Sequence, residues 1–150
     1  MNEERLRLKA TDDEDLEVFA GLLQDAPMPL TEVTHMAEDQ CFAALFRRYL
    51  YEHVHDGDSA ENLQEIDCAL VFEGVTSAEA WDIGGLGGRG AVELMTIVSE
   101  EVAGGVSITL VFHGGGHIRL ESPSIRGRLV DIGEPTKASR RPRHSPLFDF

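Results

Sequence analysis

The order of hydrophobic and polar residues predicts a short strand and then one helix near the start of the chain. In residues 5–10, charged and apolar side chains alternate, which is the pattern of a strand with one buried face. Apolar residues then recur at helical spacing through residues 12–25. Thr11, with Glu14 three positions later, has the form of a capping box at the start of this helix. The prolines at positions 27 and 29 should end the helix and keep the next residues extended.

Most of the remaining chain is expected to form strands. The segments are residues 31–36, 41–51, 67–72, 92–98, 107–113 and 117–121. The second segment also fits helical spacing, but its aromatic residues and the polar turn before it favour a strand. A glycine turn joins the last two segments into a hairpin, in which alternating apolar residues face each other when His113 lies opposite His117. Residues 52–65 have no apolar periodicity and are expected to form an exposed loop.

One helix with several antiparallel strands predicts an α+β fold. We expect a mostly antiparallel curved sheet or open barrel packed against the N-terminal helix. A pleckstrin-homology-like roll is the alternative arrangement. The core should consist of apolar residues from the helix and the hairpin, namely Leu16, Phe19, Leu23, Leu110, Phe112, Ile118 and Leu120. The single tryptophan, Trp81, is also expected in the core.

Composition narrows the classes of partner. At 150 residues and 42% hydrophobic, the chain has the length and composition of one globular domain. Its net charge of −14 repels phosphate backbones and anionic headgroups, which disfavours nucleic acids and membrane surfaces as partners. The acidic N-terminal segment lacks the features of a signal peptide, no apolar run is long enough to span a bilayer, and two cysteines cannot form a disulfide framework. We therefore expect a cytoplasmic protein.

The charge balance changes near the C-terminus. Residues 116–150 contain seven of the 13 Lys and Arg residues but four of the 27 Asp and Glu residues. We expect a single domain over residues 1–135, followed by an extended or mobile tail over residues 136–150. The tail combines a basic cluster with an aromatic end, which is typical of a short segment that binds a protein partner; a disordered solubilising end is the alternative. Its candidate partner-binding residues are Arg140, Arg141, Arg143, His144 and Phe148.

Histidines offer a different chemistry. His53 and His55 would point the same way in an extended segment, and His113 and His117 would be neighbours across the hairpin. Two such imidazoles can bind a divalent metal, which a hydrolase could use to activate water. Exposed histidines in turns are the other interpretation. No other cofactor is indicated, because the glycine-rich residues 84–90 lack the following helix and acidic residue of a dinucleotide site.

Several short motifs occur in a characteristic order along the chain. They are L-x-L and D-x-x-D-L near the N-terminus, L-Q-D-A at 23–26, L-x-F-x-G-G-G-x-I-R-L at 110–120, R-L-x-D-I-G at 128–133 and R-P-R-H at 141–144. In this order the chain resembles an uncharacterised bacterial family, domain of unknown function 2948. The resemblance implies one N-terminal helix with several strands, and it supports a strand at 41–51. It implies no activity or catalytic residue, but it indicates that R-P-R-H is part of the family pattern.

Together these observations favour a non-enzymatic cytoplasmic interaction or regulatory domain that binds a protein partner through its tail. An outer face bearing Arg119, Arg126 and Arg128 would extend the contact. The alternative is a metal-dependent hydrolase or metal-binding protein that uses the clustered histidines. Self-association into a homo-oligomer is a further alternative.

Overall fold

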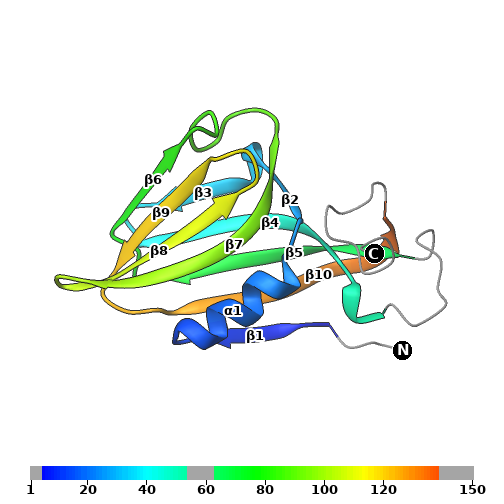
Figure 1. The fold of residues 1–150 in the computed structure, drawn as a ribbon, viewed down its shortest axis with the longest axis horizontal. Helices are drawn as coiled ribbons and strands as arrows, with labels where there is room; N and C mark the ends of the chain where they lie inside the picture. Colours follow the sequence, from blue (N-terminus) through cyan, green and yellow to red (C-terminus); the bar gives the residue numbers. More distant parts are fainter. Residues whose placement is uncertain (1–4, 54–62, 139–150) are drawn as a thin grey trace.

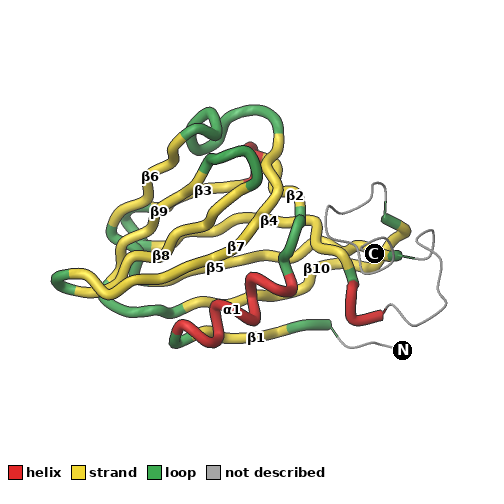
Figure 2. Tube along the Cα trace, viewed as in Figure 1, coloured by secondary structure: helices red, strands yellow, loops and turns green. Residues whose placement is uncertain are grey.

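A computed structural model gives the fold of residues 5–53 and 63–138. The described chain contains one α-helix, two short 3-10 helices and ten strands (Figures 1 and 2). In chain order they are β1 (Arg7–Ala10), α1 (Asp13–Leu22), β2 (Pro27–Pro29), η1 (Leu30–Glu32), β3 (Val33–Met36), β4 (Cys41–Tyr49), η2 (Tyr51–His53), β5 (Gln64–Glu73), β6 (Ser77–Trp81), β7 (Ala91–Val102), β8 (Gly105–Phe112), β9 (His117–Ser122) and β10 (Gly127–Lys137).

The strands form two five-stranded sheets in which the paired neighbours are antiparallel. One sheet has the order β1-β10-β5-β4-β3, and the other has the order β2-β7-β8-β9-β6. The two sheets curve around a common core (Figure 1). This arrangement confirms the predicted α+β fold, mostly antiparallel and curved, with one N-terminal helix.

Helix α1 is present as predicted, but its cap is one residue further along the chain and it ends at Leu22 rather than at residue 25. Asp12 rather than Thr11 is the N-cap, and its side chain accepts a hydrogen bond from the Asp15 backbone N–H at 2.9 Å. The Asp15 carboxylate accepts in turn from the Thr11 backbone N–H at 2.9 Å. Short acidic side chains suit this position because they accept hydrogen bonds from the unpaired N–H groups of the first turn. Their negative charge also interacts favourably with the positive end of the helix dipole. The helix buries Leu16 and Phe19 and packs on β7 and β1, so it bridges the two sheets.

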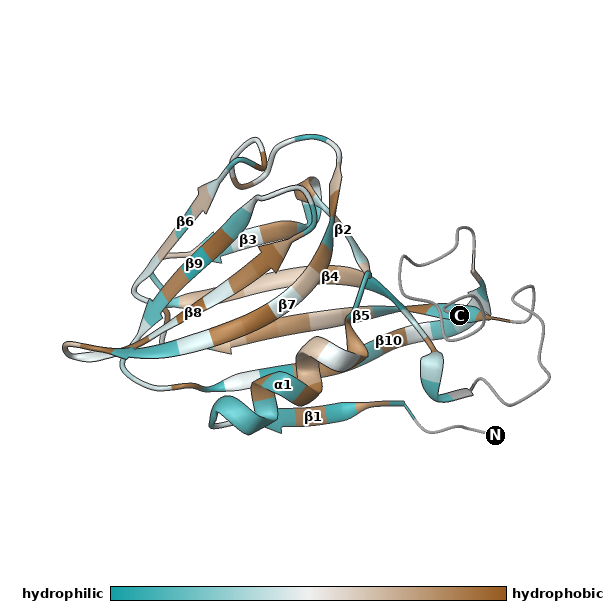
Figure 3. Cartoon of the chain, viewed as in Figure 1, coloured by the Kyte–Doolittle hydropathy of each residue, from teal (hydrophilic) through white to brown (hydrophobic). Residues whose placement is uncertain are grey.

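The predicted core is confirmed. All seven residues expected in it are at most 1% exposed, namely Leu16, Phe19, Leu23, Leu110, Phe112, Ile118 and Leu120. Large apolar side chains from β4 and β5, including Phe42, Phe46 and Phe72, complete the same cluster. Figure 3 shows the hydrophobic positions along the strands, such as β5, β8 and β9, in brown. Cys68 is also buried in it, and Cys41 is half-buried.

The β8–β9 hairpin is also present, but its register differs from the predicted one by two residues. His117 pairs with Val111 rather than with His113. The Phe112 N–H donates to the Gly116 carbonyl at 2.9 Å, so His113 lies in the turn instead of in the ladder. A shift by an even number of residues leaves every side chain on its predicted face of the sheet. This is why the predicted core is right although the predicted histidine pairing is wrong.

Two strand predictions need correction. The strand predicted at 41–51 is present but ends at Tyr49, and Tyr51 already belongs to η2. Residues 31–36 begin in η1, and only β3 is extended. The whole of β10 was missed, although it lies between β1 and β5 inside its sheet. Gly133 and Pro135 hid it, because both residues normally interrupt strands. The sheet accommodates them through a register irregularity between Ile132 and Thr136, and β10 continues two residues into the predicted tail.

Candidate functional site

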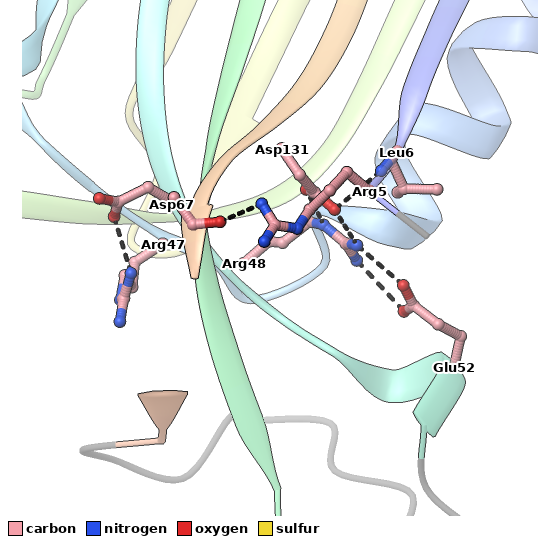
Figure 4. Close-up of polar contacts among 8 residues, drawn as sticks. Arg5, Leu6, Arg47, Arg48, Glu52, Asp67 and Asp131 are labelled. Atoms are coloured by element: carbon pink, nitrogen blue, oxygen red, sulfur yellow. Dashed lines mark hydrogen bonds and ion pairs between the residues drawn. The ribbon is translucent and has the colours of Figure 1, made fainter. Parts of the chain in front are cut away.

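A buried arginine ties together one end of the β1-β10-β5-β4-β3 sheet (Figure 4). The side chain of Arg48 on β4 is 1% exposed, and its Nε and Nη2 donate to the two carboxylate oxygens of Asp131 on β10 at 2.8 and 2.9 Å. The same guanidinium donates to the carboxylate of Glu52 in η2 at 3.2 and 2.8 Å. Asp131 also accepts from the backbone N–H of Leu6, just before β1, at 3.1 Å. These contacts fix β1, β4, β10 and η2 relative to one another.

The two groups of this pair stay charged in spite of their burial. Burial by itself disfavours the charged guanidinium, but hydrogen bonds to Asp131 and Glu52 outweigh it and raise the pKa of Arg48. Burial likewise opposes the charged carboxylate, but the bonds from Arg48 and from the Leu6 N–H lower the pKa of Asp131. Nearby on β5, burial and then the charge of Asp131 raise the pKa of the Cys68 thiol. Cys68 is therefore protonated at neutral pH and is a core residue, not a nucleophile.

Arg47, the preceding residue on β4, points to the opposite face of the same sheet. Its Nε donates to Glu65 at 2.9 Å and its Nη1 donates to Asp67 at 3.0 Å, both on β5. Its Nη2 donates to the hydroxyl of Thr136 on β10. Burial disfavours the charge of Arg47, but the two carboxylates more than compensate and raise its pKa. Because Thr136 is near the end of β10, Arg47 holds that end of the strand beside β4 and β5.

A groove of about 320 Å³ lies next to Arg47. Its apolar lining comes from β2, β4 and β7, and its charged rim comes from β4 and β5. The lining residues are Pro27, Pro29, Leu45, Phe46, Arg47, Glu65, Asp67 and Ala91. Apolar surface beside a polar, charged rim is the usual make-up of a protein-binding surface. The groove therefore presents apolar surface beside one arginine and two carboxylates.

The predicted partner-binding residues come shortly after this site in the sequence. Arg140, Arg141, Arg143, His144 and Phe148 lie outside the described residues. The structure does show where their segment begins. The backbone N–H of Ala138 donates to the carbonyl of Leu63 at 2.9 Å, at the end of the sheet that carries Arg47 and the groove.

The three arginines expected to extend this contact belong to different parts of the fold. Arg126 and Arg128 pair with Glu73 at 2.9 and 3.0 Å, next to β5 of the first sheet. Arg119 belongs to β9 of the other sheet, where its Nε lies 3.6 Å from Glu121. The expected arginine face is therefore divided between two sheets.

His113, the first histidine of the predicted hairpin pair, contacts an aspartate instead of a second histidine. Its Nε2 lies 2.9 Å from Oδ1 of Asp25, a fully buried residue with a left-handed backbone (φ 63°). Beside them, the hydroxyl of Tyr51 donates to the carbonyl of Gln24 at 3.1 Å. Burial, followed by the charge of Asp25, raises the pKa of Tyr51. This polar cluster joins the turn after β8 to the segment that follows α1.

His117 stacks on Trp81 instead, with ring centroids 4.8 Å apart and ring planes at 20°. Trp81 is 40% exposed at the end of the edge strand β6, so its predicted place in the core is wrong. His53 belongs to η2, and His55 lies outside the described residues. Over residues 5–53 and 63–138, no three or more His, Cys, Asp or Glu side chains are grouped so that they could hold a metal ion.

The sequence contained a signal for the Arg48 network that the strand prediction left unused. Once residues 41–51 are assigned to a strand, alternation places Arg48 on the same face as Phe42 and Phe46. A charged residue at a core position needs a buried partner of opposite charge. Asp131, within the R-L-x-D-I-G motif, could have been proposed as that partner had β10 been recognised.

Comparison with known proteins identifies a family. Residues 6–144 match the family described as protein of unknown function, DUF2948. The chain belongs to this family. No curated protein and no solved structure matches it. The DUF2948 match spans both partners of the Arg48–Asp131 pair and continues past β10. In the described part of this DUF2948 chain, no helix has the length and apolar character needed to cross a membrane.

Proposed function

We propose that this DUF2948 chain is a non-enzymatic cytoplasmic interaction or regulatory domain that binds a protein partner through its C-terminal tail. The proposed contact residues are Arg140, Arg141, Arg143, His144 and Phe148. The observation that carries the proposal is the extent of the family match, which continues to residue 144 although β10 ends at Lys137. The family pattern therefore includes the basic R-P-R-H segment, beyond the last strand of the described fold. Such a segment is better explained by binding than by sheet pairing.

The composition of the tail supports the same role. Residues 139–150 contain three arginines and one aspartate in a chain with a net charge of −14. Arginine and aromatic side chains are the types that contribute most binding energy at protein interfaces. The acidic body repels an acidic partner while the tail attracts it, so the charge pattern directs such a partner to the tail.

The structure supplies a fixed base for the tail. Arg47 bonds to Thr136, and the Ala138 N–H bonds to Leu63, so the final described residues belong to the sheet. A binding segment that starts from a rigid strand searches a smaller volume than one at the end of a long linker. This lowers the entropy lost when the tail binds a partner.

Affinity capture with full-length baits tests the proposal. The tail variant carries Arg140→Glu, Arg141→Glu and Arg143→Glu. The control variant carries Arg7→Glu, Arg89→Glu and Arg126→Glu, which make the same change in net charge at exposed positions of the body. Each bait is incubated at equal concentration and moderate salt with lysate of the source cells, and thermal melting confirms that each is folded.

We expect a partner that is retained by wild type and by the control variant but reduced at least tenfold with the tail variant. A tenfold reduction corresponds to about 1.4 kcal/mol of binding free energy, which is modest for three interface arginines. Equal capture by all three baits contradicts the proposal, and so does the absence of any captured protein.

A further inference from the structure

The outer face of the β1-β10-β5-β4-β3 sheet has an apolar centre, with charged residues of β1, β4, β5 and β10 around it. Val130, Ala69 and Leu45 lie opposite one another across β10, β5 and β4. Val71 and Ala43 are paired in the next row. These side chains alternate with the core residues of the same strands, so they point away from the core. A sheet face directed to water normally carries polar residues at such positions.

This apolar face leads into the groove beside Arg47. Leu45 ends the Val130–Ala69–Leu45 row and also lines the groove of about 320 Å³. At the rim, one arginine, Arg47, faces two carboxylates, Glu65 and Asp67, so the rim has one excess negative charge. The side chain of Asp67 is 45% exposed and can accept further hydrogen bonds from a cation. The groove therefore combines an apolar floor with an acidic rim.

The tail carries basic and then apolar side chains, which complement the acidic rim and the apolar floor of the groove. Its arginines come first, at residues 140–143, and Leu147, Phe148 and Phe150 follow. The tail begins beside Leu63, whereas the acidic rim is two to four residues further along β5 and Leu45 lies beyond it. Because β10 runs antiparallel to β5, the tail must reverse direction after Ala138 to pass first over the acidic rim and then over Leu45. On such a path the arginines would come to the rim before the apolar residues come to the floor. Nine residues from Ala138 to Leu147 span up to roughly 30 Å, which is ample for this path.

We propose that the tail binds to its own body, with Leu147, Phe148 and Phe150 in the groove and the arginines over Glu65 and Asp67. A short tether gives the tail an effective local concentration in the millimolar range. Binding within one chain is therefore favoured over binding to a second copy at ordinary protein concentrations. This contact needs no partner protein, so it can be tested on the isolated chain and can fail while partner binding through the tail still stands.

Methyl NMR of the full-length chain, labelled at Ala and Leu, tests the contact. Ring currents from Phe148 and Phe150 should displace the methyl resonances of residues in and next to the groove. The variant combines Leu147→Ser, Phe148→Ser and Phe150→Ser. We expect it to move the methyl resonances of Leu45, Ala69 and Ala91 and to leave those of Ala78 and Ala80, on β6 of the other sheet, unchanged. The absence of movement at the groove overturns the proposal.

Two further measurements distinguish a direct contact within one chain from an indirect effect or from self-association. In Leu45→Gln, with an intact tail, the aromatic resonances of the tail should move to those of an isolated peptide of the same sequence. Ala69→Ser serves the same purpose if Leu45→Gln does not fold. The wild-type spectrum should also be unchanged by tenfold dilution. Groove shifts that disappear on dilution would show that the tail binds a second copy, which contradicts binding within one chain.

Discussion

The pair of Arg48 and Asp131 allows a quantitative test of how the sheet is held together. Arg48→Met keeps a long side chain but removes the guanidinium, so the Asp131 side chain, 2% exposed, loses two hydrogen bonds and its opposite charge. Leaving a buried charge without its partner costs about 3–5 kcal/mol. For a chain of this length, each kcal/mol lowers the melting temperature by about 2–4 °C. We therefore expect Tm to fall by about 6–20 °C.

A double-mutant cycle separates the loss of pairing from the loss of packing. Asp131→Leu combined with Arg48→Met removes both buried charges, so the double variant should lose less stability than either single variant. Arg126→Met is the matched control, because it breaks the ion pair between Arg126 and Glu73 at the surface, where the Arg126 side chain is 60% exposed. It should lower the free energy of unfolding by less than about 1 kcal/mol. Urea denaturation followed by circular dichroism at pH 7 gives the four free energies of unfolding of the cycle and that of the control.

Two results would refute this reasoning. One is a loss below about 1 kcal/mol in Arg48→Met, which would mean that Asp131 finds water or another partner when the guanidinium is gone. The other is a double variant less stable than both single variants. That outcome would show that the pair is net stabilising even against an apolar replacement, contrary to the cost of removing two charges from water.

Three further predictions concern single features. The hydrogen bonds from Arg48 and from the Leu6 N–H hold the pKa of Asp131 below its ordinary value in the folded chain. Its stabilising contribution is therefore complete at neutral pH and is lost as the pH falls below about 4, and the double variant above should show less acid destabilisation in urea titrations. Asp12→Ala should cost about 1 kcal/mol and Thr11→Ala less than half as much, because Asp12 is the N-cap. Gly116→Ala should destabilise the fold by about 1–3 kcal/mol, because its Cβ would lie 2.2 Å from a side-chain carbon of Ile83. Gly21→Ala should instead stabilise the fold by about 0.5–1 kcal/mol, because a Cβ on Gly21 in α1 would meet no neighbouring atom. The first prediction is contradicted if wild type and the double variant lose equal stability in acid. The second is contradicted if Thr11→Ala loses more stability than Asp12→Ala, and the third if Gly116→Ala leaves the free energy of unfolding unchanged.

Local patterns predicted the elements whose stability depends on one buried face. The spacing of Leu16, Phe19 and Leu23 predicted α1, and alternation around Leu110 and Leu120 predicted the hairpin and its core face. The same face stays buried when the pairing register of β8 and β9 shifts by two residues. The alternation therefore specified which side chains point inward but not which residues pair. The turn that places His113 outside the ladder depends on a backbone bond between Phe112 and Gly116, which alternation does not encode.

Features that depend on distant partners could not be predicted in the same way. The partner of Arg48 is 83 residues away in a strand hidden by Gly133 and Pro135. The exposure of Trp81 follows from the place of β6 at the edge of its sheet, which requires the order of all five strands. The groove requires β2 to lie near β4, although it pairs with β7 of the other sheet. In each case the decisive contact is set by tertiary topology and not by the local sequence.

Adjacent residues on β4 connect this topology to the tail. Successive side chains of a strand point to opposite faces, so Arg48 bonds to β10 from the core side while Arg47 bonds to it from the outer side. The last strand of the described chain is thereby held on both faces between the first strand, β1, and β5. Together with the backbone ladders to β1 and β5, these two side chains hold β10 in place, so the tail starts from a defined point beside the groove. The same two side chains that close the sheet therefore determine where the proposed binding segment begins.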